Sequence, residues 1–175
     1  LAKIAYPSGR WVPPHHTADG ARILDVLIVG GGQGGTAIAH ALTRQRIVNF
    51  RVVDQSQPGL EGPWNTYARM ATLRSPKAVT GPDLDIPSLT FQAWFEAQHG
   101  TAAWEELNKI DKGDWVAYLL WLRRVLGLSI ENGKRVERIE PAGPYMVATI
   151  RDLVTGGEER ITARKIVLAT GIESS

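Results

Sequence analysis

The sequence of 175 residues contains no cysteine, and this absence removes several kinds of chemistry at once. Without thiols the chain can form no disulfide, no thiolate metal site and no redox dithiol. It also lacks an apolar run of the roughly 18 to 20 residues that span a bilayer, and its start lacks the apolar core of a signal peptide. We therefore expect a soluble, cytoplasmic protein with no membrane partner.

Concentrated charge of one sign is missing as well. The formal net charge is only +2, and the basic residues are scattered, with local pairs such as Arg123-Arg124 and Lys134-Arg135. Because a nucleic-acid-binding surface is normally a clustered basic patch, we expect no nucleic-acid partner.

Patterns typical of hydrolytic or metal-dependent catalysis are also absent. No serine, histidine and acid stand at a motif spacing, and no pair of carboxylates has an evident catalytic context. His15 and His16 are adjacent, a spacing that does not readily direct both side chains to one metal. We expect no metal site, and no catalytic side chain can be named.

A glycine-rich segment between a predicted strand and a predicted helix is the most informative feature that is present. The nearly continuous apolar run over 23–29 is typical of a strand buried on both faces of a parallel sheet. Helical spacing over 36–46 and an apolar segment over 50–54 complete a βαβ unit. Between them, 30–35 satisfies the pattern G-x-G-x-x-G of a dinucleotide-binding turn.

Each glycine of this pattern has its own predicted role. Gly30 permits the tight turn, Gly32 lets a pyrophosphate approach the backbone, and Gly35 allows close packing of helix on strand. With Gln33 and Gly34, they place the positive end of a helix against the phosphates, so that the backbone binds the anion. The alternative is a tight turn without a ligand.

Asp54 ends the second predicted strand, 19 positions beyond Gly35 (54 minus 35). A carboxylate there accepts hydrogen bonds from an adenosine ribose, and Gln55 is a further candidate for contact with that ribose. Because an acidic residue favours a free 2′-hydroxyl, FAD or NAD fits this site better than NADP.

The patterns in the rest of the chain are weaker. Residues 1–22 are rich in proline and glycine and predict an extended arm that lies against the domain. The proline- and glycine-rich stretch 55–89 predicts a long loop, and loops of this length are usually functional or disordered. Helices are expected near 90–98 and 112–126, and Trp94, Trp104, Trp115 and Trp121 are expected in the core, whereas His40 and His99 are expected on helix surfaces.

Short alternating segments follow from 134 to 163. Val136–Ile139, Tyr145–Ile150 and Glu159–Thr162 predict a small antiparallel meander, with a turn at 155–157. A separate buried strand is then expected over 165–169, ending in Thr170-Gly171.

Together these features resemble the N-terminal flavin domain of the two-dinucleotide-binding-domain flavoproteins, in particular their flavin-containing monooxygenase-like branch. The resemblance rests on the turn at 30–35, Asp54, the meander, and Ala169-Thr170-Gly171. Gly62-Pro63-Trp64 also resembles the Gly-Gly-x-Trp stretch beside the flavin, with one of its two glycines. The implied fold is α/β: a Rossmann-like FAD-binding domain over 23–175, with a parallel sheet and an antiparallel β-meander crossover.

The resemblance also implies cofactors and further site residues. FAD is the implied cofactor, and NAD(P)H is the implied electron donor of a full-length protein. Gly62, Trp64, Val136, Thr170 and Gly171 are implied to border FAD, with Trp64 beside the isoalloxazine and the backbone of Val136 beside the adenine. Arg69, Arg74 and Lys77 are either cations near the flavin or solvated loop charges.

The expected function is that of an FAD-dependent oxidoreductase of monooxygenase type. The chain ends four residues after Gly171 (175 minus 171), so we expect the NAD(P)H domain to lie outside it. The alternative is a truncated dinucleotide-binding module without turnover of its own. A nicotinamide-only dehydrogenase would leave the meander and Ala169-Thr170-Gly171 unexplained. Substrate and oligomeric state are not indicated.

Overall fold

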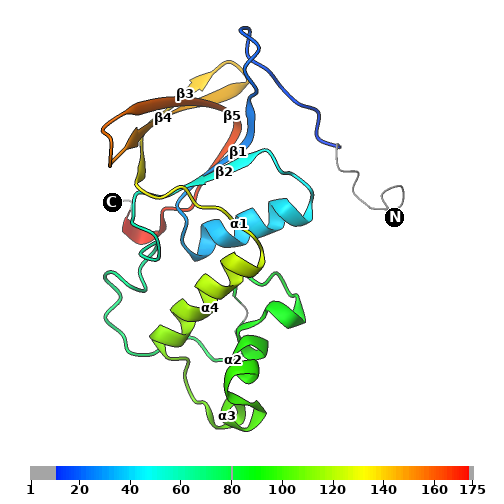
Figure 1. Ribbon diagram of the computed structural model, residues 1–175, viewed down its shortest axis with the longest axis vertical. Helices are drawn as coiled ribbons and strands as arrows, with labels where there is room; N and C mark the ends of the chain where they lie inside the picture. The colour runs from blue at the N-terminus through cyan, green and yellow to red at the C-terminus, as the bar shows by residue number, and fades with distance from the viewer. Residues whose placement is uncertain (1–10, 80, 174–175) are drawn as a thin grey trace.

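The computed structural model describes residues 11–79 and 81–173, which form a sheet with a helix against it and, beyond that helix, a second helical part (Figure 1). The strands are β1 (Leu24–Val29), β2 (Phe50–Val53), β3 (Lys134–Ala142), β4 (Tyr145–Asp152) and β5 (Glu158–Leu168). The helices are α1 (Gln33–Arg44), α2 (Phe91–His99), α3 (Thr101–Glu106) and α4 (Lys112–Val125), with short 3₁₀ turns at Pro87–Leu89 and Gly171–Glu173.

The five strands form one mixed sheet in the order β2-β1-β5-β4-β3. β1 pairs in parallel with both β2 and β5, so both its edges are hydrogen-bonded. Leu27 and Ile28 in this strand have no exposed surface, which accounts for the continuous apolar run. The predicted parallel βαβ unit and the antiparallel meander are both confirmed.

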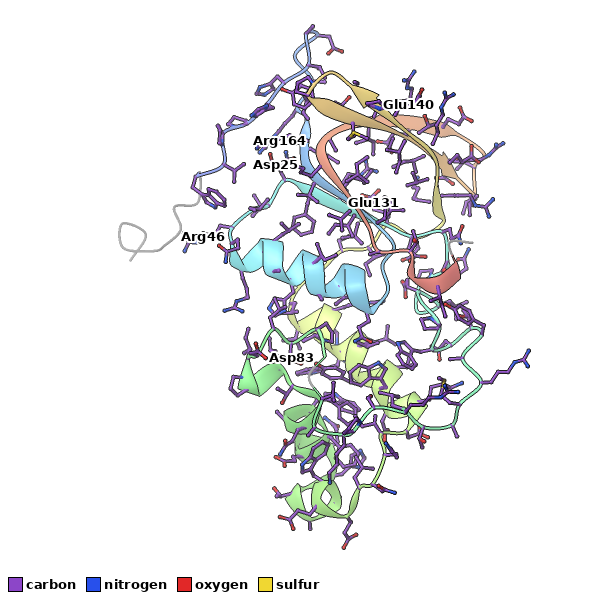
Figure 2. The ribbon with its side chains drawn as sticks, turned by 180° about the vertical axis from the view of Figure 1, so that it is seen from behind. Asp25, Arg46, Asp83, Glu131, Glu140 and Arg164 are labelled. Atoms are coloured by element: carbon purple, nitrogen blue, oxygen red, sulfur yellow. The ribbon has the colours of Figure 1, made fainter. Side chains whose placement is uncertain are left out.

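One strand prediction was wrong, because the third meander strand and the closing parallel strand are a single element, β5. Its first half pairs antiparallel with β4 and its second half pairs in parallel with β1. Ala163 belongs to both registers, opposite Met146 and Leu24. Arg164 lies within this continuous strand and donates to buried Asp25 at 3.2 Å (Figure 2).

Helix α1 begins three residues earlier than predicted, so that Gly34 and Gly35 lie in its first turn. The prediction of a surface position for His40 was wrong, because this side chain is only 2% exposed. Its Nδ1 lies 3.1 Å from the carbonyl oxygen of Pro82. The turn at 81–85 therefore packs over α1 and links it to the second helical part.

The second helical part is built around aromatic side chains. Phe91, Trp104, Trp115 and Tyr118 are buried together, and the ring of Phe91 lies within 6.3 Å of each of the others, measured between centroids. Burial raises the pKa of the Tyr118 hydroxyl, which donates to the carbonyl oxygen of Leu89 at 2.8 Å. The predicted core positions of the four tryptophans are confirmed, with Trp94 and Trp121 partly buried against this cluster.

The described part of the N-terminal segment, 11–22, packs on the domain through side-chain hydrogen bonds. The indole of Trp11 donates to the carbonyl oxygen of Gln45 at 2.7 Å, and His15 lies 2.8 Å from the hydroxyl of Tyr145. Residues 1–10 of the expected arm lie outside the described residues. Within the described ranges, no helix is both long enough and apolar enough to cross a membrane.

Shortening a buried side chain of the central strand tests the proposed core. Leu27→Ala removes a fully buried side chain from β1, and we expect the free energy of unfolding to fall by about 3 kcal/mol. Leu168→Ala is the matched control, because Leu168 is 66% exposed and its loss should cost less than about 0.5 kcal/mol. Urea denaturation measures both, and equal losses would contradict this assignment of the core.

Candidate dinucleotide-binding site

A cavity of about 420 Å³ opens where β1 and β2 end. Ligands of open α/β sheets bind in the crevice outside the carboxyl ends of parallel strands, and the volume falls within the usual range of ligand pockets. All predicted site residues except Gly35 line it, namely Gly30, Gly32, Gln33, Gly34, Asp54, Gln55, Gly62, Trp64, Val136, Thr170 and Gly171.

Close backbone approaches explain the first and last glycines of the pattern. Gly30 has a φ of 107°, and a Cβ there would lie 2.7 Å from the carbonyl carbon of Ala169. A Cβ on Gly35 would collide with the carbonyl oxygen of Gly30. Gly35 therefore lets α1 pack against the turn, and it acts behind the cavity instead of lining it.

The N-terminus of α1 is suited to an anion. Within the described residues, no side chain caps this helix and no acidic residue lies in its first turn. Gly32, Gln33 and Gly34, which carry N–H groups of this end, line the cavity. N–H groups without helical partners, together with the positive end of the helix dipole, attract phosphate.

Two basic residues of β3 line the same cavity, and the sequence analysis did not assign them to the site. Lys134 pairs with Asp152 at 2.6 Å, and Nε of Arg135 donates to Gln55 at 3.2 Å. Their place just before Val136 at the start of the meander is a signal that could have identified them. Arg135 adds positive charge to the side of the cavity formed by the meander, whereas Asp152 balances the charge of Lys134.

Asp54 is 8% exposed. Its carboxylate binds the backbone of two loops beside the cavity. One carboxylate oxygen accepts from the N–H of Gly31 and the other from the N–H of Ser56, both at 2.7 Å. Since each oxygen has two lone pairs, the carboxylate keeps acceptor capacity for a ribose hydroxyl. Contact between Asp54 and a ribose stays a prediction.

Trp64 stands between the main cavity and a second one of about 200 Å³. Its ring packs edge-to-face on Trp115, with centroids 6.2 Å apart. Its Nε1 is buried without a hydrogen-bond partner among the described residues. The aromatic cluster thus positions this indole at the cavity wall, and its contact with a flavin ring stays a prediction.

The three cations considered for the flavin line neither cavity. Arg69 and Arg74 are exposed. Lys77 donates to the carbonyl oxygen of Trp104 at 2.5 Å, and its ammonium lies 4.8 Å from the centroid of that indole. Lys77 therefore holds the loop to the end of α3.

A buried ion pair lies behind the glycine turn. Arg123 in the last turn of α4 donates to Glu61 at 2.8 Å, and their side chains are 11% and 4% exposed. Burial raises the pKa of Glu61, but hydrogen bonds from Arg123 and Asn132 outweigh it and hold the pKa below its ordinary value of 4.5. Residues far apart in the sequence form this pair, which sequence reasoning did not find.

The family model described as FAD-NAD(P)-binding matches residues 27–173. The chain belongs to this family. It is 47% identical over 174 residues to an FAD-dependent urate hydroxylase from Xanthomonas campestris, a match that covers 99% of this chain and 36% of that protein. The chain thus spans about a third of the length of this curated relative.

Several solved structures share the fold. The ornithine hydroxylase of Pseudomonas aeruginosa in its reduced form matches with a TM-score of 0.69 and 21% identity, over 85% of this chain and 39% of that one. The FAD-bound cadaverine monooxygenase of Erwinia amylovora matches with a TM-score of 0.66 and 19% identity, over 85% and 36%. The bacillithiol disulfide reductase of Bacillus cereus matches with a TM-score of 0.65 and 23% identity, over 85% and 40%.

The ion pair predicts a specific pH dependence of stability. Because the pKa of Glu61 is lower in the folded state, its stabilisation is complete above about pH 4.5 and is lost as the pH falls through the folded value. Glu61→Gln leaves Arg123 without its counter-charge and should lower the free energy of unfolding by about 3 kcal/mol at pH 7. The difference should shrink as the pH is lowered towards 3.

Urea denaturation at a series of pH values measures this difference. Glu140→Gln is the control, because Glu140 pairs with Arg138 at an exposed site where an ion pair contributes less than about 1 kcal/mol. A gap between wild type and Glu61→Gln that stays constant from pH 7 to pH 3 would contradict the account.

Proposed function

We propose that the chain is the FAD-binding domain, over 23–175, of an NAD(P)H-dependent flavin monooxygenase. The observation that carries the proposal is the uncapped N-terminus of α1, which lines the same cavity as Asp54. A dinucleotide has an anionic pyrophosphate next to a ribose, and this pair of features matches both groups.

The residues of the cavity fit FAD in their chemistry. The backbone of Gly32 and Gln33 would hold the pyrophosphate, Asp54 and Gln55 the adenosine ribose, and Val136 the adenine. The buried, unpartnered Nε1 of Trp64 is a further donor beside the cavity. Bound FAD would supply the redox chemistry, while these residues bind and orient it.

The protein's own contribution near the flavin is shape and exclusion of water. Trp64 and Gly62 line one wall of the cavity, and Thr170 and Gly171 line it from the segment after β5. Trp64 cannot move freely, since it packs on Trp115 in the aromatic cluster. A fixed aromatic wall favours one orientation of a flat ring and keeps solvent from that face.

Hydroxylation of urate or a similar oxopurine is the reaction we propose for the longer protein. It is supported by 47% identity to an FAD-dependent urate hydroxylase across 99% of this chain. The cytoplasm is the proposed location. NAD(P)H would bind in a segment outside the present chain.

A second function is favoured for the polypeptide by itself. Because it spans 36% of its urate hydroxylase relative, we propose that it binds FAD alone without catalytic turnover. The two proposals are compatible, since one concerns the longer protein and the other this chain.

An absorbance spectrum and an FAD titration test the cofactor assignment. A Cβ on Gly32 would lie 3.5 Å from its nearest neighbour, an ordinary contact, so Gly32→Ala should fold normally. Its methyl group would stand where phosphate approaches, and we expect at least about a tenfold rise in the dissociation constant for FAD, equivalent to losing one charged hydrogen bond. Tryptophan quenching and the flavin bands measure binding.

Gly157→Ala is the matched control, because it adds a methyl group at the β4–β5 turn, where the nearest atom is 3.4 Å away. It should bind FAD like wild type. Absence of saturable FAD binding by wild type would overturn the cofactor assignment. Oxidation of NADH or NADPH by the FAD-loaded chain alone would overturn the proposal that it has no turnover by itself.

A further inference from the structure

Gly31 in the middle of the glycine turn is held through its backbone from two sides. Its N–H donates to Asp54 at the end of β2, at 2.7 Å. Its carbonyl oxygen accepts from Nη2 of Arg123 in α4, at 2.6 Å. Both bonds are buried and both involve a charged side chain, which makes them stronger than ordinary backbone hydrogen bonds.

The turn needs such bonds because it has no side chain of its own to set its orientation. A Cβ on Gly31 would lie 2.6 Å from Cγ2 of Ile130, so only glycine fits. Gly30 and Gly32 flank it, and glycine peptides have more conformational freedom than any others. Without partners at the backbone, the peptide between Gly31 and Gly32 could rotate.

We infer that Arg123 is a positioning residue for the cofactor phosphates, acting through the Gly31–Gly32 peptide. In a planar trans peptide the C=O and the following N–H point in opposite directions. While Arg123 holds the carbonyl of Gly31, the N–H of Gly32 points away from Arg123, and Gly32 lines the cavity. The inference rests on the proposed function, since it assumes that phosphates occupy that cavity.

The remaining contacts of Arg123 fix its guanidinium in place. Nη1 donates to Glu61 at 2.8 Å and Nε donates to Thr36 of α1 at 3.1 Å. Glu61 in turn accepts from Asn132 at 2.7 Å and from the N–H of Gly59 at 3.0 Å. A guanidinium with all three nitrogens engaged presents one defined direction to the carbonyl of Gly31.

Stability alone is a weak reason for this arrangement. Replacing both members of a buried ion pair by apolar residues is often neutral or stabilising, whereas removing one member is costly. Orientation of the peptide is a function that an apolar pair could not supply, because it has no donor for the Gly31 carbonyl. This difference allows a purely structural role of Arg123 to be separated by experiment from its positioning role.

Titration of the ¹⁵N-labelled chain with ADP, followed by NMR, tests the inference. In wild type, the amide proton of Gly32 should move downfield as it donates to a phosphate, and adenosine, which lacks phosphates, should not move it. Arg123→Met should raise the dissociation constant for ADP about 10- to 100-fold, as expected for a lost charged hydrogen bond, and should reduce the Gly32 shift at saturation. Arg123→Lys, which keeps one donor, should restore part of both.

The double variant Arg123→Met with Glu61→Gln separates positioning from folding. Removing both charges should recover most of the stability lost in Arg123→Met, while ADP affinity and the Gly32 shift stay low because the Gly31 carbonyl still lacks its donor. If Arg123→Met does not fold, the ADP affinity and the Gly32 shift of the double variant test the inference. Arg124→Met, at the exposed neighbouring position, is the control and should behave like wild type.

Failure of this inference can be distinguished from failure of the proposed function. If wild type binds neither ADP nor FAD, the proposed function fails. If wild type binds ADP but the double variant binds it equally well with the same Gly32 shift, Arg123 is only a structural brace and this inference is overturned.

Discussion

The two charge-assisted hydrogen bonds on the backbone of Gly31 join the parts of the structure that surround the cavity. Asp54 comes from the end of β2 and Arg123 from the last turn of α4, and they hold opposite ends of one glycine residue. Thr36 of α1 contacts the same guanidinium. Three elements therefore hold the turn that faces the cavity, although the glycines around Gly31 have no side chains to hold it themselves.

The apolar packing of the second helical part serves this arrangement. Leu122 precedes Arg123 in α4 and has no exposed surface, and Trp115 and Tyr118 anchor the same helix in the aromatic cluster. Burial of these side chains supplies free energy that holds α4 in place. A buried guanidinium is costly on its own, and the packing of its helix together with Glu61 offsets that cost. The second helical part is thus connected to the glycine turn through Arg123.

Features of the fold with a strong local pattern could be predicted from the sequence. The β1-α1-β2 unit has a continuous apolar run, a glycine pattern and helical spacing, so its existence followed directly. The core positions of the tryptophans also followed from size and hydrophobicity. The continuity of β5 did not, because the strand changes its partner at Ala163, from β4 to β1, and that change depends on long-range pairing.

The residues of the site that sequence reasoning missed are those placed by long-range contacts. Arg123 reaches a carbonyl 92 positions away, and Glu61 lies in a long loop without periodicity. Lys134 and Arg135 were seen as a basic pair, but they reach the cavity through a backbone hydrogen bond from the N–H of Lys134 to the distant carbonyl oxygen of Asp54. No local pattern indicates the contacts of Arg123 and Glu61, because they depend on the path of the chain between the elements.

A crystal structure of the chain with bound FAD would test the central claim most directly. The account predicts pyrophosphate oxygens within hydrogen-bonding distance of the N–H groups of Gly32 and Gln33, with Arg123 still bound to the carbonyl of Gly31. A dinucleotide bound elsewhere, or a Gly31–Gly32 peptide turned so that the carbonyl faces the phosphates, would contradict it.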